Sequence, residues 1–245
     1  MPTIALLGYG KMGKAIDAVA AESECTVSLR LDSKSNLSPR LFENIDAIID
    51  FTSRDAFLHN LPSLLEARKP IVVGTTGWHG ELERIKEKVY EYNGAMIYAA
   101  NFSLGVQLFF RAVRAVAKLY APFPDFDIAV SEIHHTAKLD SPSGTALTIA
   151  KEILANAPRK TIIQTDTHQK PLPHELQMAS MRLGKVFGTH AMHIDSDFDA
   201  ITLEHNAKSR YGFAKGALEA AKWIQGRTGI YSIDDFLDEK LGANT

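Results

Sequence analysis

Short apolar runs alternate with helical patterns along the first hundred residues. Runs rich in β-branched residues predict strands, and apolar residues spaced three or four apart predict helices. The predicted strands are residues 3–7, 26–31, 46–51, 71–73 and 95–99, and the predicted helices are residues 11–21, 55–67 and 78–92. Apolar strands that alternate with helices predict a parallel sheet covered on both faces. Pro62 is expected to kink or split the helix that contains it.

The pattern changes after residue 102. Residues 177–183, 189–195 and 200–205 alternate apolar and polar side chains, which predicts antiparallel strands with one solvated or partner-facing side. A long helix is predicted from Ser103, its N-cap, to Leu119. The other predictions are a strand at 127–134, helices at 143–155, 209–225 and 232–241, and a loop at 165–175. The predicted fold class is therefore α/β, with a nucleotide-binding type of domain followed by an α+β domain that has a mixed sheet.

Composition narrows the class of protein. The chain has 245 residues, of which 45% are hydrophobic and 23% charged, and this excludes a disordered chain, a fibre or a coiled-coil rod. A net charge of −2 gives no electrostatic reason to expect nucleic acid or a membrane as partner. The single cysteine, Cys25, excludes an intramolecular disulfide and a Cys-rich zinc cluster. The sequence lacks a secretory signal pattern and an apolar stretch of ~20 residues, so we expect a cytoplasmic protein.

A glycine-rich turn joins the first predicted strand to the first predicted helix. Its residues are Gly8, Tyr9, Gly10, Lys11, Met12 and Gly13, a Gly-x-Gly-x-x-Gly pattern. In this setting the glycines permit a tight turn and a close approach of pyrophosphate to the helix N-terminus. The pattern therefore favours a dinucleotide site, and the alternative is a glycine turn without a ligand.

The end of the second predicted strand carries an acid. Asp32 lies 19 residues after Gly13, where a carboxylate accepts hydrogen bonds from an adenosine ribose and favours NAD over NADP. The alternative is an ordinary loop acid. Lys11, Arg30 and Lys34 are close enough in sequence to attract a 2′-phosphate, so we expect both NADH and NADPH to be usable.

Two further turns follow predicted parallel strands. They contain Gly74, Thr75 and Thr76 after the fourth strand, and Ala99, Ala100, Asn101 and Phe102 after the fifth. Open α/β sheets bind ligands at the carboxyl ends of their strands, so small residues there suit a nicotinamide ring. Ordinary turn chemistry is the alternative for each segment taken alone.

The segment from Glu132 to Thr145 is the most informative one for chemistry. His134, His135 and Lys138 gather proton donors and positive charge at the end of a predicted strand. Gly144 and Thr145 open the next helix, whose amides can hold a carboxylate. Adjacent histidines on a strand face opposite sides and chelate poorly, so no metal is expected. Surface or core histidines are the other alternative.

A run from Arg182 to His190 contains Gly184, Gly188 and Thr189 between two predicted strands. It could add an anion contact. Physical reasoning alone favours a simple glycine hairpin at this position.

These motifs together resemble the 4-hydroxy-tetrahydrodipicolinate reductase (dihydrodipicolinate reductase) family of the lysine and diaminopimelate pathway. The matching segments are GYGKMG, DFT, VGTTGW, AANFSLGV, EIHHTAKLDSPSGTAL, GTH and HNAKSRYGFAKGAL, between residue 8 and about residue 223. The resemblance implies an NAD(P)H-dependent reductase of a cyclic dicarboxylate. It implies a Rossmann-type dinucleotide-binding domain at 1–102, completed by about 212–245, and a substrate-binding and tetramerisation domain at 103–211.

The resemblance also implies roles for single residues. His134 and Lys138 match catalytic positions, and His135, Gly144 and Thr145 match substrate contacts. The cofactor contacts implied are Gly8, Tyr9, Gly10, Lys11, Met12, Gly13, Asp32, Gly74, Thr75, Thr76, Ala99, Ala100, Asn101 and Phe102. The glycine loop is one residue shorter than in many members. The alternatives are another Rossmann reductase of a small anionic substrate and a non-catalytic NAD-sensing protein.

The strands between residues 177 and 205 carry apolar side chains on both faces. The candidates for the second face are Met178, Met181, Ala191, His193 and Ile201. We expect this face to pack against copies of itself in a homotetramer, as the resemblance also implies.

Overall fold

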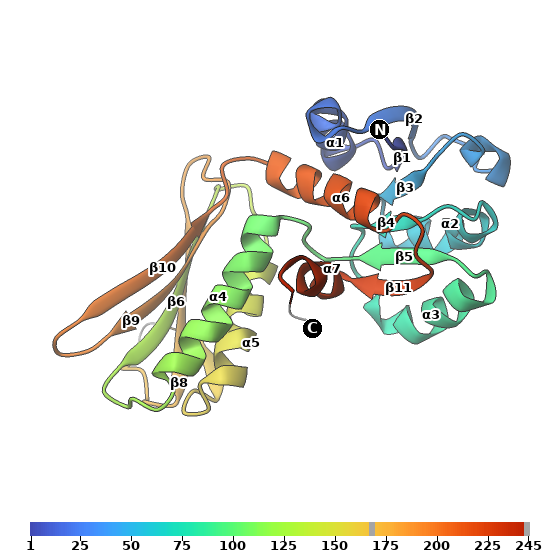
Figure 1. Ribbon diagram of the computed structural model, residues 1–245. Helices are drawn as coiled ribbons and strands as arrows, with labels where there is room; N and C mark the ends of the chain where they lie inside the picture. The colour runs from blue at the N-terminus through green and yellow to red at the C-terminus, as the bar shows by residue number, and fades with distance from the viewer. Residues whose placement is uncertain (167–169, 243–245) are drawn as a thin grey trace. The chain divides into compact units, whose positions relative to one another are not determined.

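The chain folds into two compact units, and the computed structural model describes residues 1–166 and 170–242 (Figure 1). Unit 1 comprises Met1–Leu104 together with the C-terminal segment from Arg210, and unit 2 comprises Gly105–Ser209. Three residues of the loop predicted at 165–175 lie outside the described residues. Within the described part of the chain, no helix is long and apolar enough to cross a lipid bilayer.

Unit 1 is built on a six-stranded sheet in the order β11-β5-β4-β3-β1-β2, and each neighbouring pair is parallel. The strands are β1 (Thr3–Leu7), β2 (Thr26–Leu31), β3 (Ala47–Asp50), β4 (Ile71–Val73), β5 (Ala95–Tyr98) and β11 (Gly229–Ser232). The predicted parallel sheet is thus confirmed. The short edge strand β11 was not predicted, because four residues carry too little periodicity to distinguish a strand from a turn.

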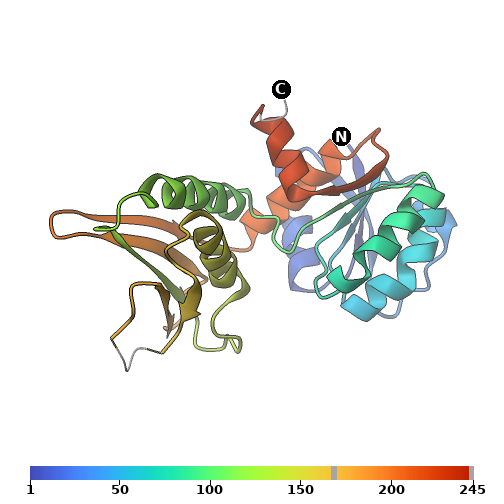
Figure 2. The same ribbon diagram turned by 90° about the horizontal axis from the view of Figure 1, so that it is seen from below.

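Helices cover both faces of this sheet (Figures 1 and 2). Ile4 and Leu6 of β1 belong to the core beneath α1 (Lys11–Val19), α6 (Tyr211–Trp223) and α7 (Ile233–Lys240). The alternate residues Ala5 and Leu7 belong to the opposite core, beneath α2 (Arg54–Glu66) and α3 (Leu82–Glu91). Short 3₁₀ helices η1 (Ala21–Ser23), η2 (Pro39–Phe42) and η3 (His79–Glu81) complete the unit. Burial on both faces explains why these strands read as continuous apolar runs.

Helix α2 runs unbroken from Arg54 to Glu66 with Pro62 inside it, so the predicted split is wrong. An internal proline removes one hydrogen bond and costs about 3 kcal/mol. Leu61, Leu64 and Leu65 surround the proline in sequence and are buried in the core, and this burial offsets the cost.

Unit 2 is a five-stranded mixed sheet in the order β10-β9-β6-β8-β7. Its elements are α4 (Leu104–Tyr120), β6 (Asp127–His134), α5 (Gly144–Asn156), β7 (Ile162–Gln164), β8 (Glu175–Arg182), β9 (Thr189–Asp195) and β10 (Ala200–Asn206). Both views draw α4 and α5 on the same face of this sheet (Figures 1 and 2). Val130 and Met192 on the sheet pack with Val113 of α4 and Ile149 of α5 in one core. The α/β fold class with a second mixed-sheet domain is confirmed.

Strand β8 runs parallel to both β6 and β7, so the predicted antiparallel pairing is wrong for the segment 177–183. Helix α5 lies between β6 and β7 in the sequence and returns the chain to the same end of the sheet. The alternation of apolar and polar residues indicates that one face of the strand is buried, but it does not indicate the direction of the strand. The short strand β7 was not predicted.

The favoured hairpin between Arg182 and His190 is also wrong. Strands β8 and β9 do not pair with each other and instead flank β6 on its two sides. Residues 183–188 therefore pass over the end of β6. This crossing brings Arg182 and His190 to the two sides of the strand that carries His134.

The second face of this sheet differs from the prediction at two residues. Met178 is 1% exposed and lies in the core under the helices. Ile201 pairs in register with Ile194, a residue of the same core, and so also lies on the helix-covered side. Met181, Ala191 and His193 lie on the face away from the helices, because they alternate with core residues along their strands.

Candidate active site

The carboxyl ends of neighbouring parallel strands place the four segments predicted to bind a cofactor at one edge of unit 1, together with the turn after β3. The turns begin at Gly8 after β1, Asp32 after β2, Phe51 after β3, Gly74 after β4 and Ala99 after β5. Open α/β sheets bind ligands at this edge. The structure thus brings together the segments that the sequence assigned to a dinucleotide.

The glycine turn has the geometry of an anion site. Gly8 adopts φ +84°, a conformation that disfavours other residues, and its N–H donates to the Leu31 carbonyl oxygen at 2.9 Å. A Cβ on Gly13 would stand 2.5 Å from the Gly8 carbonyl oxygen, so glycine allows helix α1 to approach β1. Gly10 is the N-cap of α1, and both it and Lys11 are exposed. The first amides of α1 can therefore meet a pyrophosphate.

Two other side chains of this turn face the protein. Tyr9 donates its hydroxyl hydrogen to Asp17 of α1 at 2.5 Å, and Met12 packs against the core. Their contacts hold the turn against the helix, and they leave the backbone of the turn and the exposed Lys11 as the surface available to a ligand.

Three charged residues near the end of β2, Arg30, Asp32 and Lys34, could recognise an adenosine ribose or its phosphate, and they differ in their partners. Arg30 makes a bidentate pair with Asp17 at 2.7 and 2.6 Å, which lowers the pKa of Asp17. Asp32 is exposed and accepts hydrogen bonds from the Lys34 amide at 2.9 Å and the Ser35 hydroxyl at 3.2 Å. The bond from Lys34 lowers the pKa of Asp32. Arg30 is exposed but engaged by Asp17, whereas Asp32 and Lys34 are exposed and have no ion-pair partner among the described residues.

A buried acid that sequence reasoning left without a role joins two of these turns. Asp50, which is 0% exposed, accepts hydrogen bonds from the Thr75 hydroxyl at 2.6 Å, the Thr52 hydroxyl at 2.8 Å and the Thr52 amide at 3.0 Å. Burial raises the pKa of Asp50, and these three hydrogen bonds oppose the rise. Asp50 thereby holds Thr75 in place, while Gly74 lies against the Phe51 ring and Thr76 is exposed.

The turn after β5 offers mostly backbone. Ala99 and Phe102 are buried in the core of unit 1, so a ligand could meet only their main-chain atoms. Ala100 is exposed, and the Asn101 side-chain oxygen accepts a hydrogen bond from the Ser103 amide at 2.8 Å. The expected cofactor residues are therefore grouped at one edge. Some offer an exposed side chain to a ligand, and others offer only main-chain atoms.

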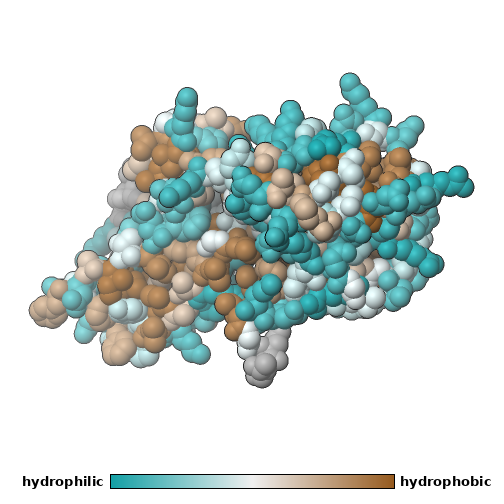
Figure 3. Space-filling view, turned by 45° about the horizontal axis from the view of Figure 1, so that its top comes forward, coloured by the Kyte–Doolittle hydropathy of each residue, from teal (hydrophilic) through white to brown (hydrophobic). Residues whose placement is uncertain are grey.

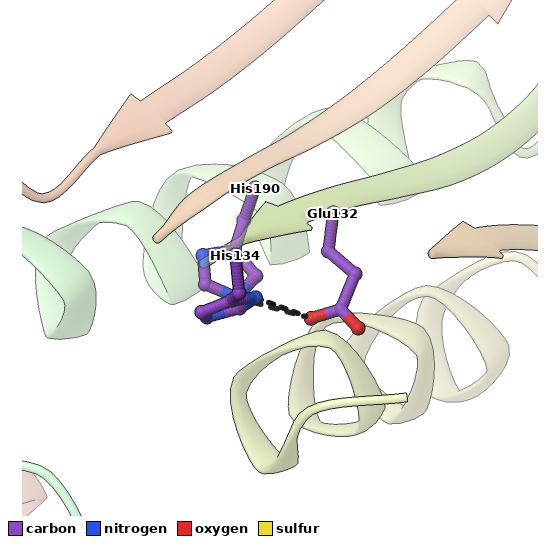
Figure 4. Close-up of side chains that lie close together, drawn as sticks. All are labelled: Glu132, His134 and His190. Atoms are coloured by element: carbon purple, nitrogen blue, oxygen red, sulfur yellow. Dashed lines mark ion pairs between the residues drawn. The ribbon is translucent and has the colours of Figure 1, made fainter. Parts of the chain in front are cut away.

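Unit 2 contains a buried cluster centred on Glu132. In the sheet register, Glu132 of β6 stands opposite Ser180 of β8 and His190 of β9. Its Oε1 accepts hydrogen bonds from the Ser180 hydroxyl at 2.8 Å and the Ser143 amide at 3.0 Å. Its Oε2 lies 3.1 Å from Nδ1 of His134, two residues further along the same strand (Figure 4).

Further contacts close the cluster. Ser143 is the N-cap of α5, where its hydroxyl oxygen accepts from the Ala146 amide at 3.2 Å and lies 3.1 Å from Nε2 of His190. The His134 and His190 rings meet edge to face with centroids 5.0 Å apart. Arg182 lies 3.4 Å from Glu132 Oε1 and donates to the Asp140 carbonyl oxygen at 2.6 Å. Ser143 therefore caps α5 and also contacts both Glu132 and His190.

The environment fixes the charges of the cluster. Burial raises the pKa of Glu132, but the hydrogen bonds from Ser143 and Ser180 outweigh it, so the pKa is lowered and the acid is ionised. Burial lowers the pKa of His134, against the opposing effect of Glu132. Burial, with the charge of His134, lowers the pKa of His190 to about 4. Both imidazoles are therefore neutral near pH 7.

The predicted proton donor lies beside this cluster. Lys138 follows β6 in a loop, and its Nζ lies 2.8 and 2.9 Å from the two carboxylate oxygens of Asp140. This bond lowers the pKa of Asp140. The charge of Lys138 also acts to lower the pKa of His134, so the two groups are electrostatically coupled. The ion pair with Asp140 was not expected from the sequence.

The predicted substrate contacts lie at the beginning of α5 and at the end of β6. Gly144 and Thr145 are the first residues of α5, and neither belongs to the buried core. The first turn of α5 has no acidic residue, so its amides and positive helix end can hold a carboxylate. His135 comes directly after β6, is half-buried, and accepts the Lys138 amide on its carbonyl oxygen at 3.1 Å.

Sequence reasoning missed most of the buried cluster. The residues missed as site components are Glu132, Ser143 and Ser180, and Arg182 and His190 were left ambiguous. A signal existed for Glu132, since it shares the core-facing side of β6 with Val130 and His134. A charged residue in that position is almost never buried without partners.

The spacing of the cluster would also suit a metal ion. Glu132, His134 and His190 each offer one ligand atom, and these atoms lie within 4.8 Å of one another. The guanidinium of Arg182 already contacts the same carboxylate, and a second cation there would meet its repulsion. The expected absence of a metal stays a prediction.

A parallel sheet with a phosphate-type glycine turn, combined with a second unit that holds an acid–histidine cluster beside a lysine, defines a two-domain enzyme of the dinucleotide-binding oxidoreductase class. Family comparison makes the assignment specific. Residues 2–102 match the model for the N-terminus of dihydrodipicolinate reductase, and residues 105–237 match the model for its C-terminus. The chain belongs to the dihydrodipicolinate reductase family.

Similar proteins cover nearly the whole chain. The 4-hydroxy-tetrahydrodipicolinate reductase of Christiangramia forsetii is 38% identical over 96% of this chain and 98% of its own. The 4-hydroxy-tetrahydrodipicolinate reductase of Akkermansia muciniphila is 39% identical over 93% and 94%. The solved dipicolinate-bound dihydrodipicolinate reductase of Paenisporosarcina sp. TG-14 superposes with a TM-score of 0.76 at 22% identity, covering 95% and 97% of the two chains. This last likeness shows the shared fold.

Proposed function

We propose that the chain reduces 4-hydroxy-tetrahydrodipicolinate to tetrahydrodipicolinate with NADH or NADPH, in lysine and diaminopimelate biosynthesis. The observation that carries the proposal is full-length similarity to relatives that have this activity in their names. The conversion adds a hydride and a proton and releases water. It therefore requires a hydride carrier, an anion site and a proton donor.

Unit 1 is the proposed dinucleotide-binding domain. The amides at Gly10 and Lys11 begin helix α1 and would receive the pyrophosphate. Asp32 would accept from the adenosine ribose, and the exposed Lys34 beside it would tolerate a 2′-phosphate. Backbone atoms at Thr75 and Ala100 would meet the nicotinamide. Hence both cofactors should be usable, with NADH favoured.

Unit 2 is the proposed substrate-binding domain. The amides of Gly144 and Thr145 at the N-terminus of α5 would hold one substrate carboxylate, with His135 close by in the sequence. A family member with dipicolinate bound supports a ring dicarboxylate as the ligand class. Hydride arrival leaves negative charge on the ring, and a cation beside it lowers the barrier.

Lys138 is the proposed proton donor. Its ammonium is a donor, whereas His134 is neutral near pH 7 because burial lowers its pKa. His134 would then contact the substrate as a hydrogen-bond partner. Lys138 would exchange its bond to Asp140 for one to the substrate during the reaction.

Unit 2 is also the proposed tetramerisation domain. Its outer sheet face carries Met181 and Ala191, and most of the exposed large hydrophobic side chains in the described residues belong to this unit. Brown side chains gather on its surface in Figure 3. A homotetramer and a cytoplasmic location stay predictions.

The test is oxidation of NADH and of NADPH by the purified chain, with substrate formed in the same cuvette by a synthase. Substrate-dependent oxidation that stops when the synthase is omitted is expected. A different substrate specificity would support another Rossmann-type reductase. Cofactor binding without turnover on any dicarboxylate would support a non-catalytic NAD sensor and would refute the proposal.

A further inference from the structure

The two nitrogens of the His134 ring have different surroundings. Nδ1 lies 3.1 Å from Oε2 of Glu132, whose side chain is 0% exposed. This is a close ionic contact outside hydrogen-bond geometry, and within the described residues both atoms are buried and have no other hydrogen-bond partner. Nε2 points toward Gly188, where an added Cβ would stand 3.0 Å away. One nitrogen therefore meets a fixed anion. The other meets a backbone position that carries no side chain.

The anion cannot turn away from His134. Oε1 of Glu132 receives the Ser143 amide, the Ser180 hydroxyl and the guanidinium of Arg182, and these donors come from the cap of α5 and from β8. The Ser143 amide is a backbone donor, so it accepts nothing in return. Oε1 is thereby kept on the side of the donors, and Oε2 is left to His134.

His190 does not compete with His134 for the carboxylate of Glu132. Ser143 already accepts the Ala146 amide on its hydroxyl oxygen, so its hydroxyl hydrogen can be donated to Nε2 of His190 at 3.1 Å. Nε2 of His190 lies 3.8 Å from Oε2 of Glu132, beyond hydrogen-bond distance. His190 packs against His134, and Oε2 of Glu132 therefore contacts His134 alone of the two histidines.

We propose that Glu132 is a positioning residue that holds His134 in the tautomer with its proton on Nδ1 and leaves Nε2 as a hydrogen-bond acceptor in the space beside Gly188. An ionised carboxylate carries no proton, so its negative charge 3.1 Å from Nδ1 favours the tautomer that places the ring N–H on Nδ1. The charged groups that act on His134 are Glu132 on its own strand, Lys138 and Asp140 in the following loop, and Arg182 on β8. The role in turnover rests on the proposed function, but the tautomer does not.

The direct test is nitrogen NMR of the chain with ¹⁵N-labelled histidine at pH 7.5. The His134 signals are identified by their loss in His134→Asn. We expect a protonated Nδ1 and an unprotonated Nε2 in the wild-type chain. A protonated Nε2 in the wild type would overturn the proposal, and this measurement needs no folded variant of Glu132.

Glu132→Gln supplies the stronger test. The Ser143 amide should keep the Gln oxygen at the Oε1 position, so the amide NH₂ would donate to His134 Nδ1. His134 should then change to the tautomer with the proton on Nε2, and kcat should fall by about 10²-fold. Glu87→Gln, an exposed acid on α3 of unit 1, should retain the wild-type tautomer and kcat. An unchanged His134 tautomer in a folded Glu132→Gln chain would contradict the positioning role.

The outcomes separate this inference from the proposed function. The expected tautomers in a chain that never reduces the substrate would refute the proposed function alone. Reductase activity with a protonated Nε2 would refute the inference alone. Stoichiometric zinc binding that is lost in His190→Ala would also overturn it, because the cluster would then be a metal site.

Discussion

At the scale of single residues, the buried acid Glu132 sets the chemistry of its neighbours. A buried carboxylate is stable only when donors replace its lost water. Ser143 and Ser180 supply such donors, and they keep Glu132 ionised beside two neutral imidazoles. These charges support the proposal that Lys138, in the loop that follows β6, is the proton donor.

Lys138→Ala should lower kcat by roughly 10²–10⁴, the range for a positioned proton donor. The affinity for NADH, measured by fluorescence titration, should be unchanged because the cofactor turns lie in unit 1. Lys151→Ala, an exposed lysine on α5, is the matched control and should retain wild-type kcat. Near-normal kcat of Lys138→Ala at saturating substrate would remove this lysine from the mechanism.

His190 should make the chain less stable in mild acid. Its pKa falls from the usual 6.5 to about 4 on folding, mainly through burial, so the unfolded chain takes up the proton first as the pH drops. Between pH 7 and pH 5 this linkage removes about 2 kcal/mol from the free energy of unfolding. Urea denaturation measures the free energy of unfolding at both pH values. In His190→Gln the loss between pH 7 and pH 5 should be smaller than in the wild type by that amount. His174→Gln, at an exposed site, should keep the wild-type loss, and equal losses in all three chains would contradict the assignment.

Asp32→Ala should weaken NADH binding more than NADPH binding. The carboxylate would accept from the ribose hydroxyls of NADH, whereas a 2′-phosphate would be repelled by it and attracted by the exposed Lys34. Dissociation constants for both cofactors provide the measurement. Unchanged NADH affinity together with weaker NADPH binding would place Asp32 away from the ribose.

At the scale of elements, strand ends are joined by buried polar groups rather than by apolar packing alone. Asp50 at the end of β3 receives hydrogen bonds from Thr52 in its own turn and from Thr75 in the turn after β4. A turn held in this way loses less entropy when a ligand binds. The edge of unit 1 that carries the proposed cofactor turns is thus held at its centre by three hydrogen bonds.

Asp50 should therefore respond in opposite ways to two substitutions. Asp50→Asn keeps an acceptor for both threonines and removes a buried charge, so it should be more stable than the wild type above the raised pKa of Asp50. The advantage should shrink in acid, because the protonated wild-type acid carries no charge. Asp50→Ala leaves Thr75 without its acceptor and should cost about 1–3 kcal/mol. The measurement is the free energy of unfolding in urea at several pH values. An Asp50→Asn chain that is less stable than the wild type at every pH would refute the argument.

At the scale of the whole molecule, no helix of the described residues covers one face of the unit 2 sheet. Helices α4 and α5 pack on the core that contains Met178 and Met192. The opposite face carries Met181, 54% exposed, and Ala191, 2% exposed. A sheet face of this kind is suited to self-association with symmetry.

Light scattering at micromolar concentration should give the mass of a homotetramer. Met181→Arg places a charge on the outer sheet face and should shift the mass toward smaller species. Leu119→Arg, on α4, is the control and should leave the mass unchanged. A monomeric mass for the wild type would contradict the proposed assembly.

The sequence by itself determined the elements whose signal is local. Strands β1 to β5, the glycine turn and the beginning of α5 follow from apolar periodicity, from the glycines and from capping, and each depends on residues a few positions apart. Only the tertiary structure decided that β8 lies parallel to β6 and that β9 lies on its other side. Glu132 and Ser180 are 48 residues apart, and their contact depends on strand order and register. Periodicity records which face of a strand is buried, but the neighbours that cover it are selected by packing across the whole sheet.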